Sequence, residues 1–568
     1  MREVDPDAYA ATPHRAGGAG YGEVVTGGLA DVLVVGAGPT GLALAAQLAA
    51  SGVRARLIDR GLDRVRESRA LAIQPRSLEV LAGLGVTDEL VACGNPAVQL
   101  RIHVRGRDLA VPLFDLGLDD TAYPYLLFLS QAETERVLAG YLAAAGVLVE
   151  RGVELAGLSD TADAAVATLR HRDGRDEVIP ARFVAGCDGA RSTVRRLAGI
   201  AFEGSSYPQT FVLADVDADG VEPGAAHAFV ADSGVLFFFP LGRPAPWRLL
   251  AMRPPDDRTP PEAPVTLAEV QALASTYTGG AVRLRDPVWM TNFRLHHRAA
   301  ARYRSGRVFL AGDAAHVHSP AGAQGMNTGI QDAVNLGWKL AHALRGPTDP
   351  ALLDSYEAER APIGRMVLRF SDRAFTIAAS TNPVARFART RLVPGVIPLA
   401  LKAGTGRAYA FRTISQLNIG YRHSRLSLDG PSPPRTGPKA GDRLPDASIV
   451  QQGQPIRLHR VVAAAGWHLL LCGPPDAWTA QTTTQLGERS ASFVTVHHLT
   501  AQDTPGALHD PTGQALHRLG LTAQHTAQYL VRPDGHVGYR AGGTDVTGLA
   551  RYLGRWLPDS QTSTSQPE

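Results

Sequence analysis

Three glycines and an acid near the start of the chain have the residue types and spacing of a dinucleotide site. Gly36, Gly38 and Gly41 follow an apolar run, and Asp59 stands roughly twenty residues further on. The first glycine permits a tight turn, the second lets the backbone approach a pyrophosphate, and the third lets a helix pack closely. The acid can accept hydrogen bonds from a ribose hydroxyl and disfavours a 2′-phosphate. This motif predicts a bound dinucleotide, and it does not distinguish NAD from FAD.

A second candidate site is the stretch ARFVAGCDGARSTVRRLAGI. An apolar run ends there at Asp188, and Arg191 and Arg195 stand at the expected start of a helix. Basic groups beside a glycine turn suit a phosphate-bearing ligand. An ordinary strand-to-helix turn with solvated arginines explains the same pattern equally well.

A third stretch, FLAGDAAHVHSPAGAQGMNTGIQDAVNLGWKLA, combines acids, histidines and a glycine-rich turn. An apolar run ends at Gly312 and Asp313, so the acid is placed to bind a polyol. The turn leads into an amphipathic helix whose N-terminus, from Gly325 to Asn327, offers partial positive charge. His316 and His318 have no second cluster to support them, so we expect packing and hydrogen bonding from them and no metal site.

The elements around these motifs indicate an α/β fold. Residues 31–35 and 53–58 are predicted as buried strands with a helix over 40–50 between them, which is a strand–helix–strand unit of a parallel sheet. Short strand-like runs follow over 101–123 and 201–289. They include an aromatic hairpin in GVLFFFPLGRPAPWRLLAM.

Helical periodicity returns after Asn327 and continues with breaks to about Arg391. A stretch rich in proline and glycine, LDGPSPPRTGPKAGDRLPD, then predicts a linker. Beyond Ala447, strands and helices alternate in a compact domain, and the final residues, PDSQTSTSQPE, have the composition of a disordered tail.

Composition excludes several classes of protein. The 568 residues are 45% hydrophobic and 20% charged, and the net charge is +3 with scattered arginines, which argues against a nucleic-acid partner. The N-terminal segment lacks the apolar core of a secretory signal, and no apolar run is long enough to predict a membrane span. Cys93, Cys187 and Cys472 are widely spaced without a CxxC pair, which fits a reducing cytoplasm.

The order of these motifs resembles that of the single-component FAD-dependent aromatic hydroxylases, which have the para-hydroxybenzoate hydroxylase fold. The stretch ESRALAIQPRSLEVLAGLG is similar to the family's ribityl-binding segment, with Arg69 and Arg76 as its basic residues. Gln131 and Glu135 stand in a similar setting in YPYLLFLSQAETERVL, and LLDSYEAERAPIG is also close to the family pattern. The resemblance is strong over residues 31–367.

The C-terminal part resembles the thioredoxin-like extension of the long family members, which include aromatic polyketide hydroxylases, rifampicin monooxygenase and bacterial phenol hydroxylases. The stretches GDRLPDASI, WHLLLCGPP and YLVRPDGHVGYRA carry this likeness. Cys472 stands near the position of a thioredoxin CxxC, but the partner cysteine is missing. We therefore expect a structural or interface role for it.

The resemblance implies an α/β architecture with a Rossmann-like FAD-binding domain, an inserted and mainly antiparallel β substrate domain, and a thioredoxin-like C-terminal domain. The implied division is a flexible tail (1–29), the FAD-binding domain (30–100, 124–199 and 290–395), the substrate domain (101–123 and 200–289), a linker (396–440), the thioredoxin-like domain without CxxC (441–556) and a disordered tail (557–568).

FAD is the implied cofactor, with its adenosine end on the first motif and its ring against the Pro320–Gly325 turn. Backbone amides at the helix start would stabilise the anionic reduced flavin. No second GxGxxG exists, so NADPH or NADH is expected to bind transiently, near Arg191 or Arg195. The implied contacts of FAD are Gly36, Gly38, Pro39, Thr40, Gly41, Asp59, Arg60, Arg69, Gln131, Asp188, Gly312, Asp313, Pro320, Gly322, Gly325, Met326 and Asn327.

The implied activity is hydroxylation of a polycyclic polyketide or antibiotic-like aromatic by O2 and NAD(P)H, through a flavin C4a-hydroperoxide. Baeyer–Villiger or epoxidising chemistry and antibiotic inactivation remain alternatives, and a non-oxygenating flavoprotein or binding protein is the rival class. Phe237, Phe239 and Trp289 are candidates for an aromatic substrate pocket, although ordinary sheet core explains each of them too. No catalytic base can be named, and a homodimer is left open.

Two positions depart from the family pattern. Ser319 stands where a second proline is frequent, and Ala323 stands where a third glycine is frequent. Both adjoin the turn that is expected to contact the flavin ring. We therefore expect these two residues to make the loop over the flavin differ from that of other family members.

Overall fold

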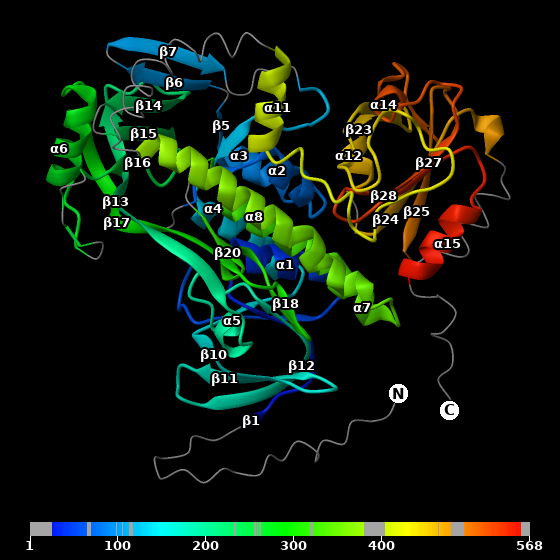
Figure 1. Ribbon diagram of the computed structural model, residues 1–568, viewed down its shortest axis with the longest axis horizontal. Coiled ribbons are helices and arrows are strands. Elements are labelled where there is room, and N and C mark those ends of the chain that lie inside the picture. Colours follow the sequence, from blue (N-terminus) through cyan, green and yellow to red (C-terminus); the bar gives the residue numbers. More distant parts are fainter. Residues whose placement is uncertain are drawn as a thin grey trace.

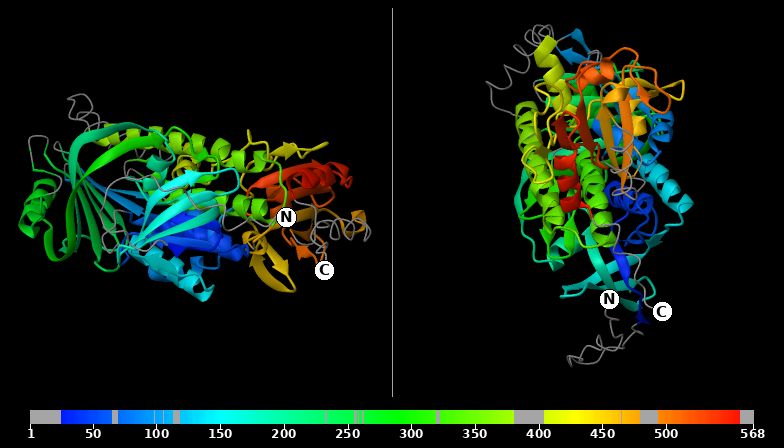
Figure 2. Two further views of the ribbon diagram at one scale, coloured as in Figure 1. Left: turned by 90° about the horizontal axis from the view of Figure 1, so that it is seen from below. Right: turned by 90° about the vertical axis from the view of Figure 1, so that its right-hand side faces the viewer.

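Figure 1 shows the molecule as three sheet-containing regions. The sheet that comes second along the chain is called the middle sheet, and it lies at one end of the molecule. The C-terminal domain lies at the other end, with the N-terminal sheet between them (Figure 2). Arg69, Ser319 and Pro320, and most of the two predicted tails, lie outside the described residues. The computed structural model describes residues 25–64, 70–97, 99–104, 106–112, 118–231, 234–254, 257, 259–260, 263–318, 322–379, 404–463, 465–478 and 493–557.

The N-terminal region is built on a nine-stranded sheet whose central strands are parallel. The run from Val32 to Val35 is apolar at every position because both faces of its strand are covered. The predicted strand–helix–strand unit is confirmed, with helix α1 (Pro39–Ala50) between strands β2 and β3. The strands are β1 (Val25–Thr26), β2 (Ala30–Val35), β3 (Ala55–Asp59), β9 (Val149–Arg151), β10 (Val153–Asp160), β11 (Ala165–His171), β12 (Asp176–Gly186), β18 (Arg304–Ser305) and β19 (Val308–Leu310).

Helices surround this sheet, and a small sheet adjoins it. The sequence from Asn327 to His342 is buried at every position, because this helix packs against α1 and also contributes Trp338 to the core of the C-terminal domain. The helices are α2 (Pro75–Ala82), α3 (Thr87–Cys93), α4 (Gln131–Ala144), α5 (Thr193–Leu197), α7 (Gly325–Arg345) and α8 (Ala351–Ala379), and the small sheet contains β4 (Ala72–Ile73), β5 (Asn95–Ala97) and β8 (Leu126–Phe128).

The middle region is an eight-stranded sheet in the order β20–β17–β13–β16–β15–β14–β6–β7. All neighbours in it are antiparallel except β14 and β6, which agrees with the expected substrate domain. The aromatic hairpin is confirmed as β15 and β16, and helix α6 (Leu267–Thr278) packs on the sheet. The strands are β6 (Gln99–Val104), β7 (Arg107–Pro112), β13 (Phe202–Asp219), β14 (Ala226–Ala231), β15 (Gly234–Pro240), β16 (Trp247–Met252), β17 (Arg283–Ala300) and β20 (His316–Val317).

The C-terminal region is a mixed sheet in the order β21–β28–β27–β24–β25–β26–β22–β23. Strand β24 is parallel to β25 and antiparallel to β27, which fits the expected α/β domain. Helices α12 (Leu458–Val461), α14 (Gln514–Arg518) and α15 (Thr547–Trp556) accompany the sheet. Its strands are β21 (Leu428–Asp429), β22 (Ser448–Gln451), β23 (Gln454–Arg457), β24 (Trp467–Cys472), β25 (Val494–Thr500), β26 (Leu508–His509), β27 (Ala527–Val531) and β28 (Val537–Gly542).

The predicted linker over residues 396–440 differs from the structure. It contains helix α11 (Gly404–Ile414) and strand β21, which pairs with β28 of the C-terminal sheet. The glycines in GTGRAYAFRTI weaken its helical signal, so contacts with the rest of the molecule decide its conformation. Across the described part of the chain, we find no helix with the length and apolar character needed to span a membrane.

Candidate cofactor and substrate site

A cavity of about 610 Å³ runs from the first glycine motif to the inner face of the middle sheet. It collects residues that are distant in sequence, from all three of the predicted motifs. Its lining includes Gly38, Pro39, Thr40, Gln131, Cys187, Gly189 and Asp313 at one end, Ala70, Leu71, Ala72, Gln74, His318, Gly322, Ala323, Gln324, Gly325 and Met326 at the other, Leu213, Phe239, Leu250, Phe293, Arg294, Leu295 and His296 from the middle sheet, and Phe411 and Ile414 from α11.

The first glycine motif leaves room at one position and none at the other two. Gly36 has a φ of +101°, and a Cβ there would lie 2.5 Å from the carbonyl oxygen of Cys187. A Cβ on Gly41 would lie 1.9 Å from the carbonyl oxygen of Gly36. A Cβ on Gly38 would meet nothing within 4 Å, and α1 begins there without a side-chain cap. Its first backbone N–H groups are therefore available to a phosphate.

Asp59 closes this turn onto the neighbouring strand. Its carboxylate accepts hydrogen bonds from the backbone N–H groups of Ala37 and Gly61, both at 2.7 Å. The side chain keeps 21% of its surface exposed, which leaves an edge for a ribose hydroxyl. Arg60 beside it is exposed.

Gln131 and Glu135 form a pair beside the first motif. Gln131 lines the cavity and donates a hydrogen bond to Oε1 of Glu135 at 2.8 Å. Glu135 is 1% exposed, and burial raises its pKa to about 7, against the opposing effect of the bond from Gln131. A carboxyl group with a pKa near neutrality, that of Glu135, therefore lies directly behind Gln131, which lines the cavity.

The second motif caps a helix. Asp188 accepts hydrogen bonds from the hydroxyl of Ser192 at 2.5 Å and from the backbone N–H groups of Thr193 at 2.6 Å and Val194 at 3.1 Å. It therefore stabilises the start of α5. Gly189, the next residue, lines the cavity. The side chain of Asp188 is occupied by this capping role, and its expected contact with FAD stays a prediction.

Arg195, an expected contact of NAD(P)H, has hydrogen-bond partners within the protein. Its guanidinium donates hydrogen bonds to the carbonyl oxygens of Ala314 at 2.8 Å and Ala190 at 2.9 Å, and it lies 3.7 Å from the ring centre of Phe202. Burial lowers the pKa of Arg195. The side chain packs the loop beneath the cavity, whereas Arg191 is exposed.

Gly312 brings Asp313 to the cavity wall. Gly312 has a φ of +60°, and a Cβ there would lie 2.4 Å from Oγ1 of Thr40. Only glycine permits this close approach between the first and third motifs. Asp313 follows as an exposed residue in the cavity lining.

The turn before α7 has a backbone that favours glycine at two positions. Gly322 has a φ of +81° and Ala323 a φ of +53°, both in the left-handed region. Ala323, which stands where the family frequently has a glycine, is therefore a strained residue. Gly325 and Met326 line the cavity where α7 begins, and this helix also lacks a side-chain cap.

The side chain of Asn327 braces this turn. It accepts a hydrogen bond from the backbone N–H of Gln74 at 2.8 Å and donates to the carbonyl oxygens of Ala72 at 2.9 Å and Ala323 at 2.7 Å. The residue is fully buried. Only its backbone is left for the contact with FAD that was expected.

Several lining residues were not anticipated from the sequence. Gln74 is fully buried and donates from Nε2 to the carbonyl oxygen of Gly322 at 2.8 Å, and its Oε1 has no hydrogen-bond partner among the described residues. It is the N-cap of α2 and precedes Pro75, a pair that marks a helix start in the sequence. Phe411 and Ile414 were missed because their helix was predicted as linker.

The middle sheet supplies one of the three aromatic candidates. Phe239 lines the cavity, whereas Phe237 and Trp289 share its sheet face without lining the cavity. Arg248 explains the difference at Trp289, because it pairs with Asp215 on this face and its guanidinium lies 6.0 Å from the centre of the tryptophan ring. Phe237 stacks on Phe239 at 5.5 Å.

Arg76 differs from its expected place in a ribityl-binding segment. It is 2% exposed, and its guanidinium donates to Glu79 at 3.1 Å and to the carbonyl oxygen of Asp534 at 2.5 Å. The side chain therefore points into the C-terminal domain and away from the cavity.

His316 has the packing and hydrogen-bonding role expected of it. Its Nε2 lies 2.7 Å from Oδ2 of Asp332, and its ring stacks on His318 at 5.5 Å. Burial favours the neutral form of Asp332, but the charges of Arg360 and His316 hold its pKa below the usual value. Asp332 also accepts from the backbone N–H of Gly312 at 3.1 Å, so this buried acid holds the turn that carries Asp313.

A glycine-lined nucleotide edge that opens into an apolar cavity defines a class of protein: a dinucleotide-dependent enzyme whose cofactor reaches a buried substrate. Residues 29–371 match the FAD binding domain family, and residues 437–559 match the C-terminal domain of aromatic-ring hydroxylases. The chain belongs to the FAD-dependent aromatic-ring hydroxylases.

Two relatives and two solved structures illustrate this membership. The chain is 37% identical over 542 residues to 6-methylpretetramide 4-monooxygenase of Streptomyces rimosus, covering 92% of this chain and 93% of that one. It is 39% identical over 365 residues to rifampicin monooxygenase of Streptomyces venezuelae, covering 62% and 72%. Anhydrotetracycline hydroxylase OxyS of Streptomyces rimosus shares 31% identity and a TM-score of 0.74, over 94% of this chain and 100% of that one. Aklavinone-11 hydroxylase with FAD and aklavinone shares 27% identity and a TM-score of 0.76, over 93% and 99%.

The geometry of the cavity fits FAD. Gly38 faces open space beside the uncapped start of α1, as a pyrophosphate requires. At the other end, the buried Oε1 of Gln74 is without a protein partner in the cavity wall, beside the uncapped start of α7. Both ends therefore present polar groups that a dinucleotide would satisfy.

Proposed function

We propose that the protein uses FAD, NAD(P)H and O2 to hydroxylate a polycyclic aromatic small molecule of polyketide type. One observation carries the proposal: a single cavity joins the nucleotide edge at Gly38 to a wall of apolar side chains on the middle sheet. The relatives support the substrate class, since the names of several refer to tetracycline precursors, rifampicin or aklavinone.

The residues along the cavity have distinct tasks in this proposal. The backbone amides of Thr40 and Gly41, which follow Pro39 at the start of α1, hold the pyrophosphate, while Gln131 and Asp313 orient the polyol chain. Amides at Gly325 and Met326 stabilise negative charge on the reduced ring through the positive end of α7. Bound FAD, once reduced, supplies the activation of O2.

The middle sheet holds the substrate and excludes water. Leu213, Leu250, Phe293 and Leu295 form its apolar part, and Phe239 adds an aromatic face. Excluding water protects a reactive oxygen species from wasteful breakdown. Arg191 remains the exposed candidate for a transient contact with NAD(P)H, because the guanidinium of Arg195 is engaged elsewhere.

Labelled oxygen tests this function. Purified holoprotein would receive ¹⁸O2 and NADPH or NADH, together with either multi-ring phenols or one-ring phenols. We expect one labelled oxygen atom in a multi-ring product and stimulated NAD(P)H oxidation. Absence of label from every product would reject the monooxygenase, and a preference for one-ring phenols would reject the substrate class. A lactone or epoxide product would favour the alternative oxygenations.

A matched pair of variants tests the substrate wall. Phe239→Ala removes a lining ring and should raise the KM for a multi-ring substrate about tenfold, which corresponds to about 1.4 kcal/mol. Phe237→Ala removes a ring from the same sheet face that does not line the cavity. Because Phe237 stacks on Phe239, we expect a smaller rise in KM from this variant. An unchanged KM in Phe239→Ala would remove Phe239 from the binding site.

We further propose that the protein works in a reducing cytoplasm without nucleic-acid or membrane partners; a homodimer stays an open alternative to a monomer. The three free thiols at Cys93, Cys187 and Cys472 support the compartment. Light scattering of the purified protein tests the dimer, and a monomeric mass at micromolar concentration would contradict it.

A further inference from the structure

Helix α2 lies between the cavity and the C-terminal domain. At its N-cap, the backbone N–H of Gln74 donates to Asn327, and the side chain of Gln74 donates to the carbonyl oxygen of Gly322, both at 2.8 Å. These two bonds fix the turn that is proposed to contact the flavin ring. The position of α2 therefore determines the position of this part of the cavity wall.

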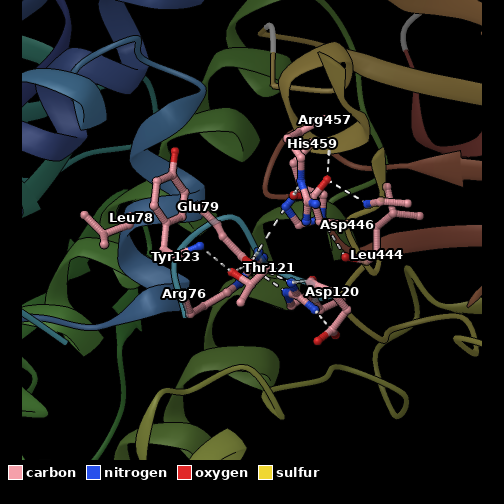
Figure 3. A network of polar contacts seen from close by, with 12 residues as sticks. Arg76, Leu78, Glu79, Asp120, Thr121, Tyr123, Leu444, Asp446, Arg457 and His459 are labelled. Atoms are coloured by element: carbon pink, nitrogen blue, oxygen red, sulfur yellow. Dashed lines mark hydrogen bonds and ion pairs between the residues drawn. The ribbon is translucent and has the colours of Figure 1, made fainter. Parts of the chain in front are cut away.

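The next turn of α2 is held by the C-terminal domain through buried charges (Figure 3). Glu79 accepts hydrogen bonds from Nε of Arg443 at 2.7 Å and from Nη2 of Arg443 at 2.5 Å. Arg76 reaches the carbonyl oxygen of Asp534 at 2.5 Å. The side chains of Arg76, Glu79 and Arg443 are at most 4% exposed, so water does not replace these contacts.

Arg443 also reaches a second wall of the cavity. It donates to the carbonyl oxygen of Asp120 at 2.5 Å and to Oδ2 of the same residue at 3.1 Å. Arg412 on α11 donates to the other carboxylate oxygen of Asp120 at 2.6 Å. Two residues further on, Ile414 lines the cavity and its carbonyl oxygen accepts from Gln324 at 2.8 Å.

Charge and shape show that this contact is tightly built. Burial favours the neutral form of Glu79, yet the charge of Arg443 keeps its pKa far below the usual value, so the pair stays ionised. At the far end of α2, a Cβ on Gly83 would lie 2.6 Å from the carbonyl oxygen of Ala463. The helix thus meets the C-terminal domain both by a bidentate ion pair and by direct backbone contact.

We propose that the C-terminal domain sets the geometry of the flavin-ring end of the cavity, with Arg443 as the positioning residue that acts through Glu79 and α2 on Gln74. This gives the C-terminal domain a part in the reaction although it carries no CxxC pair. The consequence for oxygen transfer rests on the function proposed above, whereas the dependence of the position of Gln74 on Arg443 does not.

The test compares Arg443→Gln with Arg540→Gln. Arg540 is an equally buried arginine of the same domain, and its partners, Asp429, Pro434 and Pro438, lie within the C-terminal part of the chain. Hydrogen exchange is measured on the FAD-free protein for peptides that cover residues 70–76 and 322–328. We expect about tenfold faster exchange there in Arg443→Gln and unchanged exchange in Arg540→Gln.

The holoprotein gives a second readout. Arg443→Gln should shift the visible absorption of bound FAD and lower the fraction of NAD(P)H that yields hydroxylated product, at an unchanged KM for NAD(P)H. Arg540→Gln should change neither. If Arg443→Gln lowers the free energy of unfolding but changes exchange and absorption no more than Arg540→Gln does, the domain is only a stabilising unit and the proposal is overturned.

Gly83→Ala keeps every charge and covers the case in which Arg443→Gln does not fold. The added Cβ displaces α2 from Ala463, and Gly83 has a φ of −61°, so alanine meets no backbone strain. We expect faster exchange at residues 70–76 in this variant too. Wild-type exchange at these residues would contradict the proposal, and it would leave the monooxygenase function untouched.

Discussion

The two ends of the cavity are built by different means. At the nucleotide end, Gly36 and Gly41 shape the turn by backbone sterics within six residues of one another, and Gly38 between them leaves room for a ligand. At the ring end, Gln74 meets Asn327 across 253 residues of sequence, and Gln324 meets Ile414 across 90. The first end depends on missing side chains, whereas the second depends on side-chain amides that bridge separate segments.

This difference has a physical consequence for how each end fails. A turn that depends on close backbone packing is disrupted when a Cβ is added, because the neighbouring backbone atoms cannot move away. A hydrogen-bonded brace fails when one partner is removed, because buried donors and acceptors lose their bonds. Substitutions that add or remove atoms therefore separate the two ends.

The largest effect is expected from adding an atom at the nucleotide end. Gly41→Ala places a Cβ 1.9 Å from the carbonyl oxygen of Gly36, so α1 must shift. We expect a loss of about 4 kcal/mol in the free energy of unfolding and failure to retain FAD. Gly140→Ala, at an exposed position of helix α4, has open space around its Cβ and should be neutral or stabilising. Equal stability of the two variants would contradict the steric account.

Removing atoms at the ring end comes next. Asn327→Ala leaves the N–H of Gln74 and the carbonyl oxygens of Ala72 and Ala323 without their partner. We expect a loss of about 3 kcal/mol in denaturant unfolding of the FAD-free protein. A loss below about 1 kcal/mol would show that the brace is not required, and the contrast between the ends would collapse.

Acidity sharpens the comparison at the nucleotide end. The pKa of Glu135 is about 7 in the folded protein against an ordinary value of 4.5, so the native state binds more protons between these values. Stability therefore falls as the pH rises from about 4.5 to 7. Glu135→Gln should be more stable than the parent by about 3 kcal/mol at pH 8, with the gain vanishing near pH 4.5. Unfolding of the FAD-free proteins across this range measures it, and a pH-independent difference would refute the assignment.

The smallest effect comes from relaxing the ring-end backbone. Ala323→Gly relieves a φ of +53° and should stabilise the FAD-free protein by about 0.5–1 kcal/mol. Ala145→Gly, at an exposed residue with a φ of −84°, should destabilise it slightly. Destabilisation by Ala323→Gly would mean that the methyl group packs usefully against its neighbours.

The sequence predicted what neighbouring residues determine. The strand–helix–strand unit and the aromatic hairpin follow from local periodicity and turn chemistry, and both are present. The nature of the ring end does not follow, because Arg76 finds its partner in Asp534, 458 residues away. Helix α11 was missed for the same reason, since its own sequence is a weak helix former and its contacts are distant.

The pairing of Glu79 with Arg443 has a consequence in time. The two residues are separated by 364 positions, and a ribosome adds about 5–20 residues per second. Glu79 therefore leaves the ribosome about 20–70 s before the arginine that neutralises it. During that interval the nucleotide turn can already form, while Glu79 on α2 is exposed and still lacks Arg443. Synthesis thus imposes an order in which the nucleotide turn precedes a finished ring end.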